Sequence, residues 1–122
     1  MKNWIVFGSL LAALAVILGA FGAHALKTRV TPEELTVFET GVKYHFYHAL
    51  GMILVGIIGF HYPPQLLKLP AIALSLGILL FSGSLYLVVL SSMKWLGAIT
   101  PLGGVAFILG WLSLAFNIYR FS

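Results

Sequence analysis

The sequence predicts an all-α integral membrane protein built as an antiparallel four-helix bundle. Of its 122 residues, 61% are hydrophobic and 8% are charged, whereas soluble domains carry about 25% charged residues. The mean hydropathy is +1.05. Four apolar segments, each long enough to cross a hydrocarbon core of ~30 Å, follow one another with short connections. We therefore expect a single transmembrane domain over residues 1–122, with both termini on one side.

The first predicted span covers residues 4–24. Lys2 could begin a signal peptide, but the apolar run that follows is longer than the usual apolar region of about 7–15 residues. We therefore expect a permanent span. Small residues recur at steps of three and four on one face, which lets a neighbouring helix approach closely. They are Gly8, Ala12, Ala15, Gly19, Gly22 and Ala23.

The second predicted span, residues 42–60, follows a helix-start signal. Thr31 suits the N-cap, Pro32 the first helical position, and Glu34 completes a capping box. A helix from Pro32 to Phe60 would be about 45 Å long, which exceeds the hydrocarbon thickness. We therefore predict that its first turns form a short interfacial helix leading into the span.

The third predicted span, residues 71–90, follows a proline-rich turn between Tyr62 and Pro70. It carries two faces of small or polar residues, Ser75, Ser82 and Tyr86 on one side and Gly77, Ser84 and Ser91 on the other. Two such faces indicate a helix packed on both sides, either at the centre of the bundle or against a second copy of the chain.

The fourth predicted span covers residues 101–119. Thr100 is its predicted N-cap, and Pro101 occupies the first turn, where a missing N–H costs little. Its small face comprises Gly103, Ala106, Gly110, Ser113 and Asn117.

The charges and the absence of cysteine limit the classes of partner. The seven Lys and Arg residues occur singly, so no nucleic-acid partner is predicted. We expect membrane lipids as partners and leave a homo-oligomer open. Three basic residues lie on the side of the termini and four on the other, which favours a cytoplasmic connection at Lys27 and Arg29 by a small margin. Disulfides and thiolate metal sites are excluded because the chain has no cysteine.

A polar cluster near one membrane interface is the predicted ligand-binding site. Polar side chains at membrane depth usually face the bundle interior and pair with one another. The central expectation is that the imidazoles of His24 and His48 meet inside the bundle. Glu39 and Lys43 have the spacing of an i,i+4 ion pair. The full predicted set is His24, Glu39, Lys43, His45, His48, Ser82, Ser84, Tyr86 and Thr100.

Several functions stay open for such a cluster. It could bind a small solute, an ion or a lipid head group, or only fix the helix register. The alternative is a small oligomeric proton-coupled transporter or channel, since histidine titrates near neutral pH. The H-E-x-x-H spacing of zinc sites is absent, and we expect neither metal nor cofactor. No catalytic residues are assigned, because the chain has no Asp, no G-x-S-x-G elbow and no phosphate loop, so an enzyme is not expected.

Four separated motifs carry a family resemblance that extends over essentially the whole chain. They are Gly19–His24, Phe38–His48, Phe81–Tyr86 and Leu96–Gly104. With these motifs the sequence resembles the uncharacterised family of small bacterial inner-membrane proteins of the YgdD/YwdK type. The resemblance implies a four-span protein of the bacterial inner membrane and carries over no reaction. It also implies that position 45 tolerates other residues, which makes His24 and His48 the firmer site members.

Overall fold

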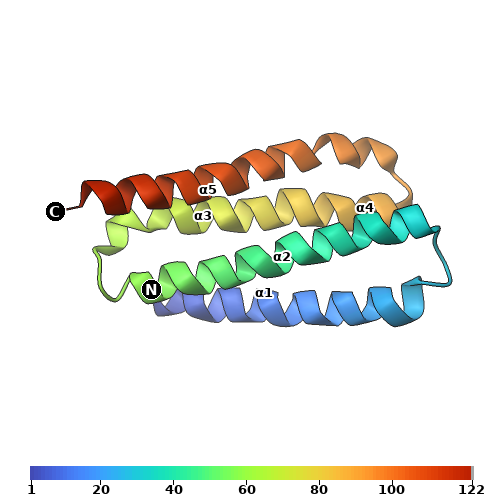
Figure 1. Cartoon of the computed structure of the whole chain (residues 1–122), viewed down its shortest axis with the longest axis horizontal. Helices are drawn as coiled ribbons and strands as arrows, with labels where there is room; N and C mark the ends of the chain where they lie inside the picture. The colour runs from blue at the N-terminus through green and yellow to red at the C-terminus, as the bar shows by residue number, and fades with distance from the viewer. Residues whose placement is uncertain (122) are drawn as a thin grey trace.

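The computed structural model describes residues 1–121, which form four long helical segments side by side (Figure 1). The first is α1 (Lys2–Phe21), extended by a π-helical turn, η1 (Gly22–Leu26), and the second is α2 (Pro32–Ile58). The third consists of α3 (Lys68–Gly77), a π-helical turn, η3 (Ile78–Ser82), and α4 (Gly83–Ser91). The fourth is α5 (Thr100–Arg120). Short 3₁₀ turns, η2 (Pro64–Leu66) and η4 (Lys94–Ala98), precede the third and fourth segments.

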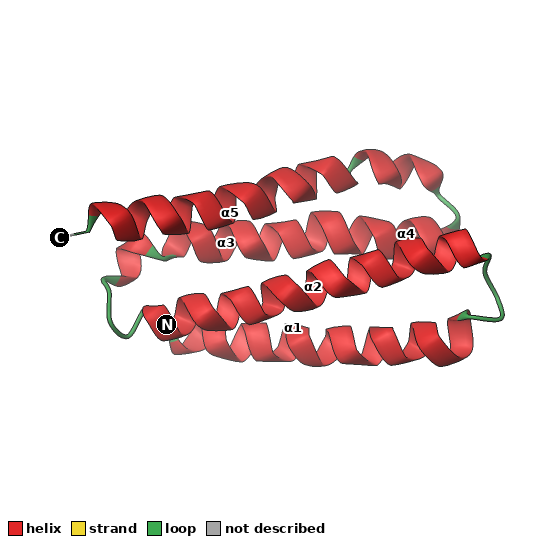
Figure 2. Cartoon of the chain, viewed as in Figure 1, coloured by secondary structure: helices red, strands yellow, loops and turns green. Residues whose placement is uncertain are grey.

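The predicted all-α fold with four spans is confirmed. Each of the four segments within residues 1–121 is long and apolar enough to cross a membrane. The regular structure of this part of the chain is helical throughout (Figure 2). Both termini lie at the same end of the molecule, as an even number of antiparallel spans requires (Figure 1).

The helices form a flattened row rather than a square bundle. α1 packs on α2, α2 packs on the third segment, and the third segment packs on α5 (Figure 1). The second and third segments therefore bury far more of their residues than the two outer ones. Met52, Leu74 and Phe107 fill the centre between α2, α3 and α5. This order leaves grooves on both sides of the seam between α1 and α2.

The start of α2 follows the sequence signal, but the predicted interfacial helix is not a separate element. The hydroxyl of Thr31 accepts from the N–H of Glu34, and the Glu34 carboxylate accepts from the N–H of Thr31. From this capping box the helix continues unbroken to Ile58, because no proline follows Pro32 before the helix ends.

Two helix starts differ from their predictions. α3 begins at Lys68, so Pro70 lies inside its first turn rather than in a non-helical connection, a position where its missing N–H is tolerated. α5 begins at Thr100 with Ile99 as N-cap, and no side chain caps it. Thr100 is therefore not the predicted cap, because its hydroxyl is engaged with Ser84 of α4 instead.

Glycines on the predicted small faces allow close helix contacts. Gly8 of α1 lies against the carbonyl of Ala49 in α2, Gly77 lies against the Phe107 ring, and Gly103 lies against the backbone of Phe81. The third segment thus uses both of its small or polar faces within one chain, one against α2 and the other against α5. α5 covers Gly77 and Ser84 of that second face, whereas Ser91 is exposed and bonds within its own helix. Most of the surface that the sequence had offered to a second copy is therefore occupied by α5.

Candidate functional site

A histidine and a tyrosine form a buried polar pair where α2 meets α4. Nδ1 of His45 lies 2.8 Å from the hydroxyl oxygen of Tyr86. His45 is the middle residue of α2, with thirteen residues on each side, and only 2% of it is exposed. Gly41 makes room for the Tyr86 ring one turn earlier on α2, since a Cβ there would lie 2.9 Å from that ring. The pair therefore lies at mid-helix rather than near the start of the span.

The second ring nitrogen of His45 has no partner. Nε2 is buried and makes no hydrogen bond with any of residues 1–121. The backbone of Leu11 in α1 approaches this ring closely enough to interact with it electrostatically, although the contact does not have the geometry of a hydrogen bond. A buried polar atom without a partner is uncommon in folded proteins and calls for a physical explanation.

The hydrogen-bond network assigns the proton of the imidazole. If Nδ1 carried it, the Tyr86 hydroxyl would have no acceptor among the described residues, and Nε2 would also be unsatisfied. If the Tyr86 hydroxyl donates to Nδ1, only one group remains unsatisfied, the N–H at Nε2. Buried polar groups without partners are costly, so the tautomer with one unsatisfied group is favoured over the tautomer with two. His45 thus presents a free hydrogen-bond donor.

An apolar groove of about 410 Å³ runs between α1 and the third segment beside this imidazole. Its wall on α1 is a stripe at steps of four, three and four, formed by Phe7, Leu11, Leu14 and Leu18. The opposite wall comes from α2 and from α3 to α4, and consists of His45, Ser75, Leu76, Ile78, Leu79, Gly83 and Tyr86. The Ser75 hydroxyl already donates to the carbonyl of Ala71. The donor at Nε2 of His45, which is covered in this structure, is therefore the unpartnered polar group nearest to the groove lining.

His48 has a packing role one turn further along α2. Its Nδ1 donates to the carbonyl of Tyr44 at 2.7 Å. Its ring stacks on Phe107 of α5, with ring centres 3.5 Å apart and planes 10° apart. The imidazole therefore joins α2 to α5, away from the groove at His45.

The predicted serines and threonine form separate contacts rather than one cluster with the histidines. The Ser82 hydroxyl, in the π-helical turn of the third segment, donates to the carbonyl of Gly41 at 2.7 Å. The hydroxyls of Ser84 and Thr100 lie 2.5 Å apart and tie α4 to the start of α5. These bonds fasten neighbouring helices within the chain.

The predicted meeting of His24 and His48 is wrong. Gly22 of the first segment packs on Phe38, and Gly19 packs on Val42. In this antiparallel register His24 lies level with the region of Thr36, which is about 18 Å along the axis from His48 at 1.5 Å per residue. His24 is also exposed, as are Glu39 and Lys43. His24 does not reach the buried polar groups because the bundle register sets it near the end of its helix.

No group of three or more His, Cys, Asp or Glu side chains within residues 1–121 lies close enough to hold a metal ion. The polar atoms that line the His45 groove are uncharged nitrogen and oxygen groups on three side chains. The arrangement suits recognition of a hydrogen-bond acceptor carried by an apolar molecule.

Sequence reasoning missed the groove and placed its histidine, His45, below His24 and His48. The α1 stripe from Phe7 to Leu18 was detectable by helical periodicity, about 100° around the helix from the small-residue face. Neither the stacking of His48 on Phe107 nor the free nitrogen of His45 has a local sequence signal, since both depend on which helices are neighbours.

The long apolar helices and their packing define an integral membrane protein with four candidate spans in residues 1–121. A model for a protein family of unknown function, DUF423, matches residues 18–104. The chain is 44% identical over 119 residues to the UPF0382 membrane protein YwdK of Bacillus subtilis (strain 168), covering 93% of this chain and 94% of the relative. It is 40% identical over 121 residues to a UPF0382 membrane protein of Staphylococcus haemolyticus (strain JCSC1435), covering 99% and 98%.

The chain therefore belongs to the DUF423/UPF0382 family of membrane proteins, whose function is unknown. This confirms the family resemblance of the four motifs. No solved structure matches the chain.

Proposed function

We propose that the protein binds, without catalysis, a neutral apolar molecule that enters laterally from the bilayer. The molecule lies in the groove between α1 and the third segment and places one hydrogen-bond acceptor against Nε2 of His45. The observation that carries the proposal is the buried Nε2 of His45, which has no hydrogen-bond partner among the described residues and belongs to a side chain that lines an apolar groove.

The cost of the unpartnered nitrogen favours a ligand over a purely structural role. Leaving a buried donor unsatisfied costs about 1–3 kcal/mol, and hydrocarbon supplies no water to replace the acceptor. Phenylalanine at both positions 45 and 86 would fill similar space and leave no polar group unpartnered. A carbonyl or ether oxygen in the groove would recover the lost hydrogen bond.

The lining sets the chemistry of the occupant. Of the residues that line the groove, none carries a carboxylate, ammonium or guanidinium group, so a charged ligand would find no counter-ion. Leucine and isoleucine side chains provide most of the surface. Because Nε2 itself is covered, the acceptor reaches it when a flexible side chain such as Leu11 changes rotamer.

The alternatives gain less support. A proton-coupled transporter requires a polar pathway along the bundle, whereas Met52, Leu74 and Phe107 fill its centre. Transport by an oligomer would also require a helix face for the second copy, and α5 covers the one that the sequence suggested. An enzyme would need an acid or base in contact with a substrate, whereas Nδ1 of the His45 imidazole is already engaged by the Tyr86 hydroxyl. Binding is therefore the simplest function for this geometry.

The test compares decyl methyl ketone with dodecane, two probes of similar length that differ in a carbonyl. Each is added to the full-length protein in detergent micelles, and the melting temperature is followed by circular dichroism. The ketone should raise the melting temperature of the wild type more than dodecane does, because only the ketone accepts from Nε2. A single net hydrogen bond corresponds to about 1 kcal/mol.

Matched variants locate the effect. H45F together with Y86F removes both polar groups and leaves no phenol hydroxyl without a partner, so the difference between ketone and alkane should vanish. H24F removes an exposed imidazole outside the groove and should keep the difference. Equal effects of the two probes on the wild type, or a difference that persists in H45F/Y86F, would refute the proposal.

A further inference from the structure

Lys43 is unusual among the basic residues because it lies well inside a long helix. It is the twelfth of 27 residues in α2. The other six occur at helix ends or in connections: Lys2, Lys27, Arg29, Lys68, Lys94 and Arg120. The predicted second span begins at residue 42, so Lys43 lies where α2 enters the membrane, at the level of the lipid head groups.

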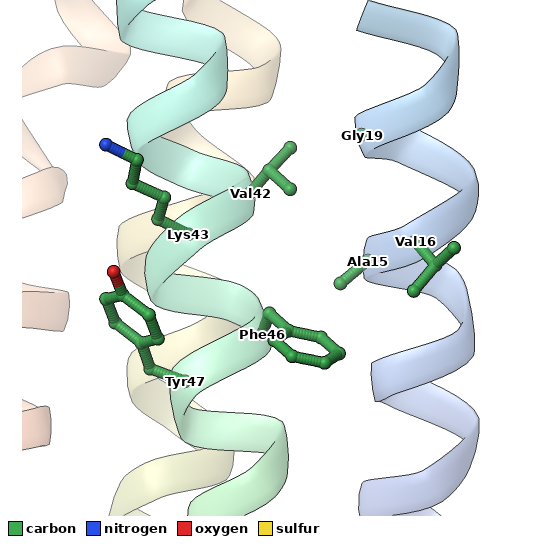
Figure 3. A pocket seen from close by; sticks show the side chains of 7 residues that line it. All are labelled: Ala15, Val16, Gly19, Val42, Lys43, Phe46 and Tyr47. Atoms are coloured by element: carbon green, nitrogen blue, oxygen red, sulfur yellow. The ribbon is translucent and has the colours of Figure 1, made fainter.

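The position of Lys43 at the start of the span favours an anionic partner at the membrane surface. A lysine near the end of a span extends its amine toward the interface, with its methylene groups on apolar surface. Figure 3 shows the Lys43 amine and the Tyr47 hydroxyl pointing toward the N-terminal end of α2. That end of the molecule also carries the connection with Lys27 and Arg29. Both polar groups thus face the level where lipid head groups lie.

A second groove, of about 280 Å³, lies directly beside these two side chains. Small residues on α1, Ala15 and Gly19, face Val42 and Phe46 of α2 across it (Figure 3). Apart from Lys43 and Tyr47, the residues that line it are Ala15, Val16, Gly19, Val42 and Phe46, all apolar. An acyl chain fits such a lining. The Lys43 ammonium points away from α1 on the neighbouring side of α2 (Figure 3), where it complements a negatively charged head group.

We infer that this groove is a binding site for an anionic phospholipid. The phosphate of the lipid contacts the Lys43 ammonium and accepts a hydrogen bond from the Tyr47 hydroxyl. One acyl chain lies in the groove against the exposed Val16 of α1 and against Phe46 of α2. The site is thus a fixed lipid position on the seam between α1 and α2, recognised by head-group charge and by the apolar groove.

This site is separate from the groove at His45. Lys43 lies two residues before His45, which places the two side chains about 200° apart around the helix. They therefore face opposite sides of the seam with α1, and neither proposal depends on the other. The competing role for Lys43 is the ion pair with Glu39 expected from their spacing.

The experiment measures lipid binding to the full-length protein by native mass spectrometry from detergent micelles. Phosphatidylglycerol is titrated against phosphatidylcholine, and the apparent dissociation constant of the first bound lipid is compared. The wild type should bind phosphatidylglycerol about fivefold more tightly, the contribution expected from one basic residue near anionic lipid. K43Q should lose this preference, whereas K43R should retain it.

Three further variants separate the site from general attraction. K94Q removes an exposed lysine at the same end of the molecule and should leave the preference unchanged. V16F fills the groove from an exposed position and should weaken binding with the charge intact. E39Q should keep the preference if phosphate, rather than Glu39, is the partner of Lys43. The inference is overturned if K43Q keeps the preference, if K94Q and K43Q reduce it equally, if V16F binds like the wild type, or if E39Q abolishes it.

Discussion

Nδ1 of His45 and the hydroxyl of Tyr86, 2.8 Å apart, join the middle of α2 to α4 across the bundle interior. This bond orients the imidazole and leaves the N–H at Nε2 without a partner in residues 1–121. One contact between two helices thus determines which nitrogen of the ring is free to bind a ligand.

Replacing Tyr86 with Phe should lower the free energy of unfolding by about 1 kcal/mol, the net value of one hydrogen bond. It should also release the imidazole from a single tautomer, because Nδ1 loses its donor. Unfolding in sodium dodecyl sulfate measures the first effect, and ¹⁵N shifts of labelled histidine measure the second. Y119F, at a tyrosine that is 86% exposed, serves as the control. Unchanged histidine shifts in Y86F would contradict the assigned hydrogen bond.

Replacing His48 with Ala should be more damaging than replacing it with Phe. Ala loses both the bond to the Tyr44 carbonyl and the stack on Phe107, which together correspond to about 2 kcal/mol. Phe keeps an aromatic ring against Phe107 and should recover roughly half of that loss. Unfolding in sodium dodecyl sulfate compares the two variants. Equal stability of H48A and the wild type would show that His48 does not join α2 to α5.

Replacing Gly103 with Ala should weaken the contact between α5 and the third segment. The added Cβ would overlap backbone atoms of Phe81, so no rotamer change relieves the clash, and overpacking of this kind costs about 1–3 kcal/mol. G97A is the matched control, since a Cβ at Gly97 has nothing within 4 Å. Melting temperatures in detergent should fall for G103A and hold for G97A. A G103A protein as stable as G97A would contradict the close packing.

Ser84 and Thr100 should show coupled energies in a double-mutant cycle. Their hydroxyls bond to each other between α4 and α5, so S84A and T100V should each cost about 1 kcal/mol, and the double variant should cost less than their sum. The free energies of unfolding of the four proteins give the coupling. If Thr100 acted as the N-cap that its sequence position suggested, the two losses would add independently.

Local signals in the sequence were sufficient for much of the fold. The capping box at Thr31 and Glu34 depends on neighbours three residues apart, so it was predictable in detail. The two polar faces of the third segment were also predictable from helical periodicity. The partners of those faces were not predictable, because a stripe of small residues can pack equally well on α5 or on a second copy of the chain.

The site was less predictable because it depends on the register between helices. His24 and His48 have the same imidazole side chain, so the sequence does not distinguish them. Only the packing of Gly19 on Val42 and of Gly22 on Phe38 shows that they lie at different positions along the bundle axis. The π-helical turn at Ile78–Ser82 has the composition of ordinary helix, although it contains the serine that bonds to Gly41. The free nitrogen of His45 became apparent only when its neighbours in α1 and α4 were known.

The most direct measurement of the central claim is the ¹⁵N resonance of Nε2 of His45 during titration with decyl methyl ketone in micelles. Labelled histidine is assigned by comparison with H45F/Y86F, and dodecane provides the reference titration. The account predicts a saturable shift of the protonated Nε2 resonance of His45 with the ketone, no such shift with dodecane, and an unchanged His24 resonance. A His45 resonance that responds equally to both probes, or to neither while the protein stays folded, would contradict it.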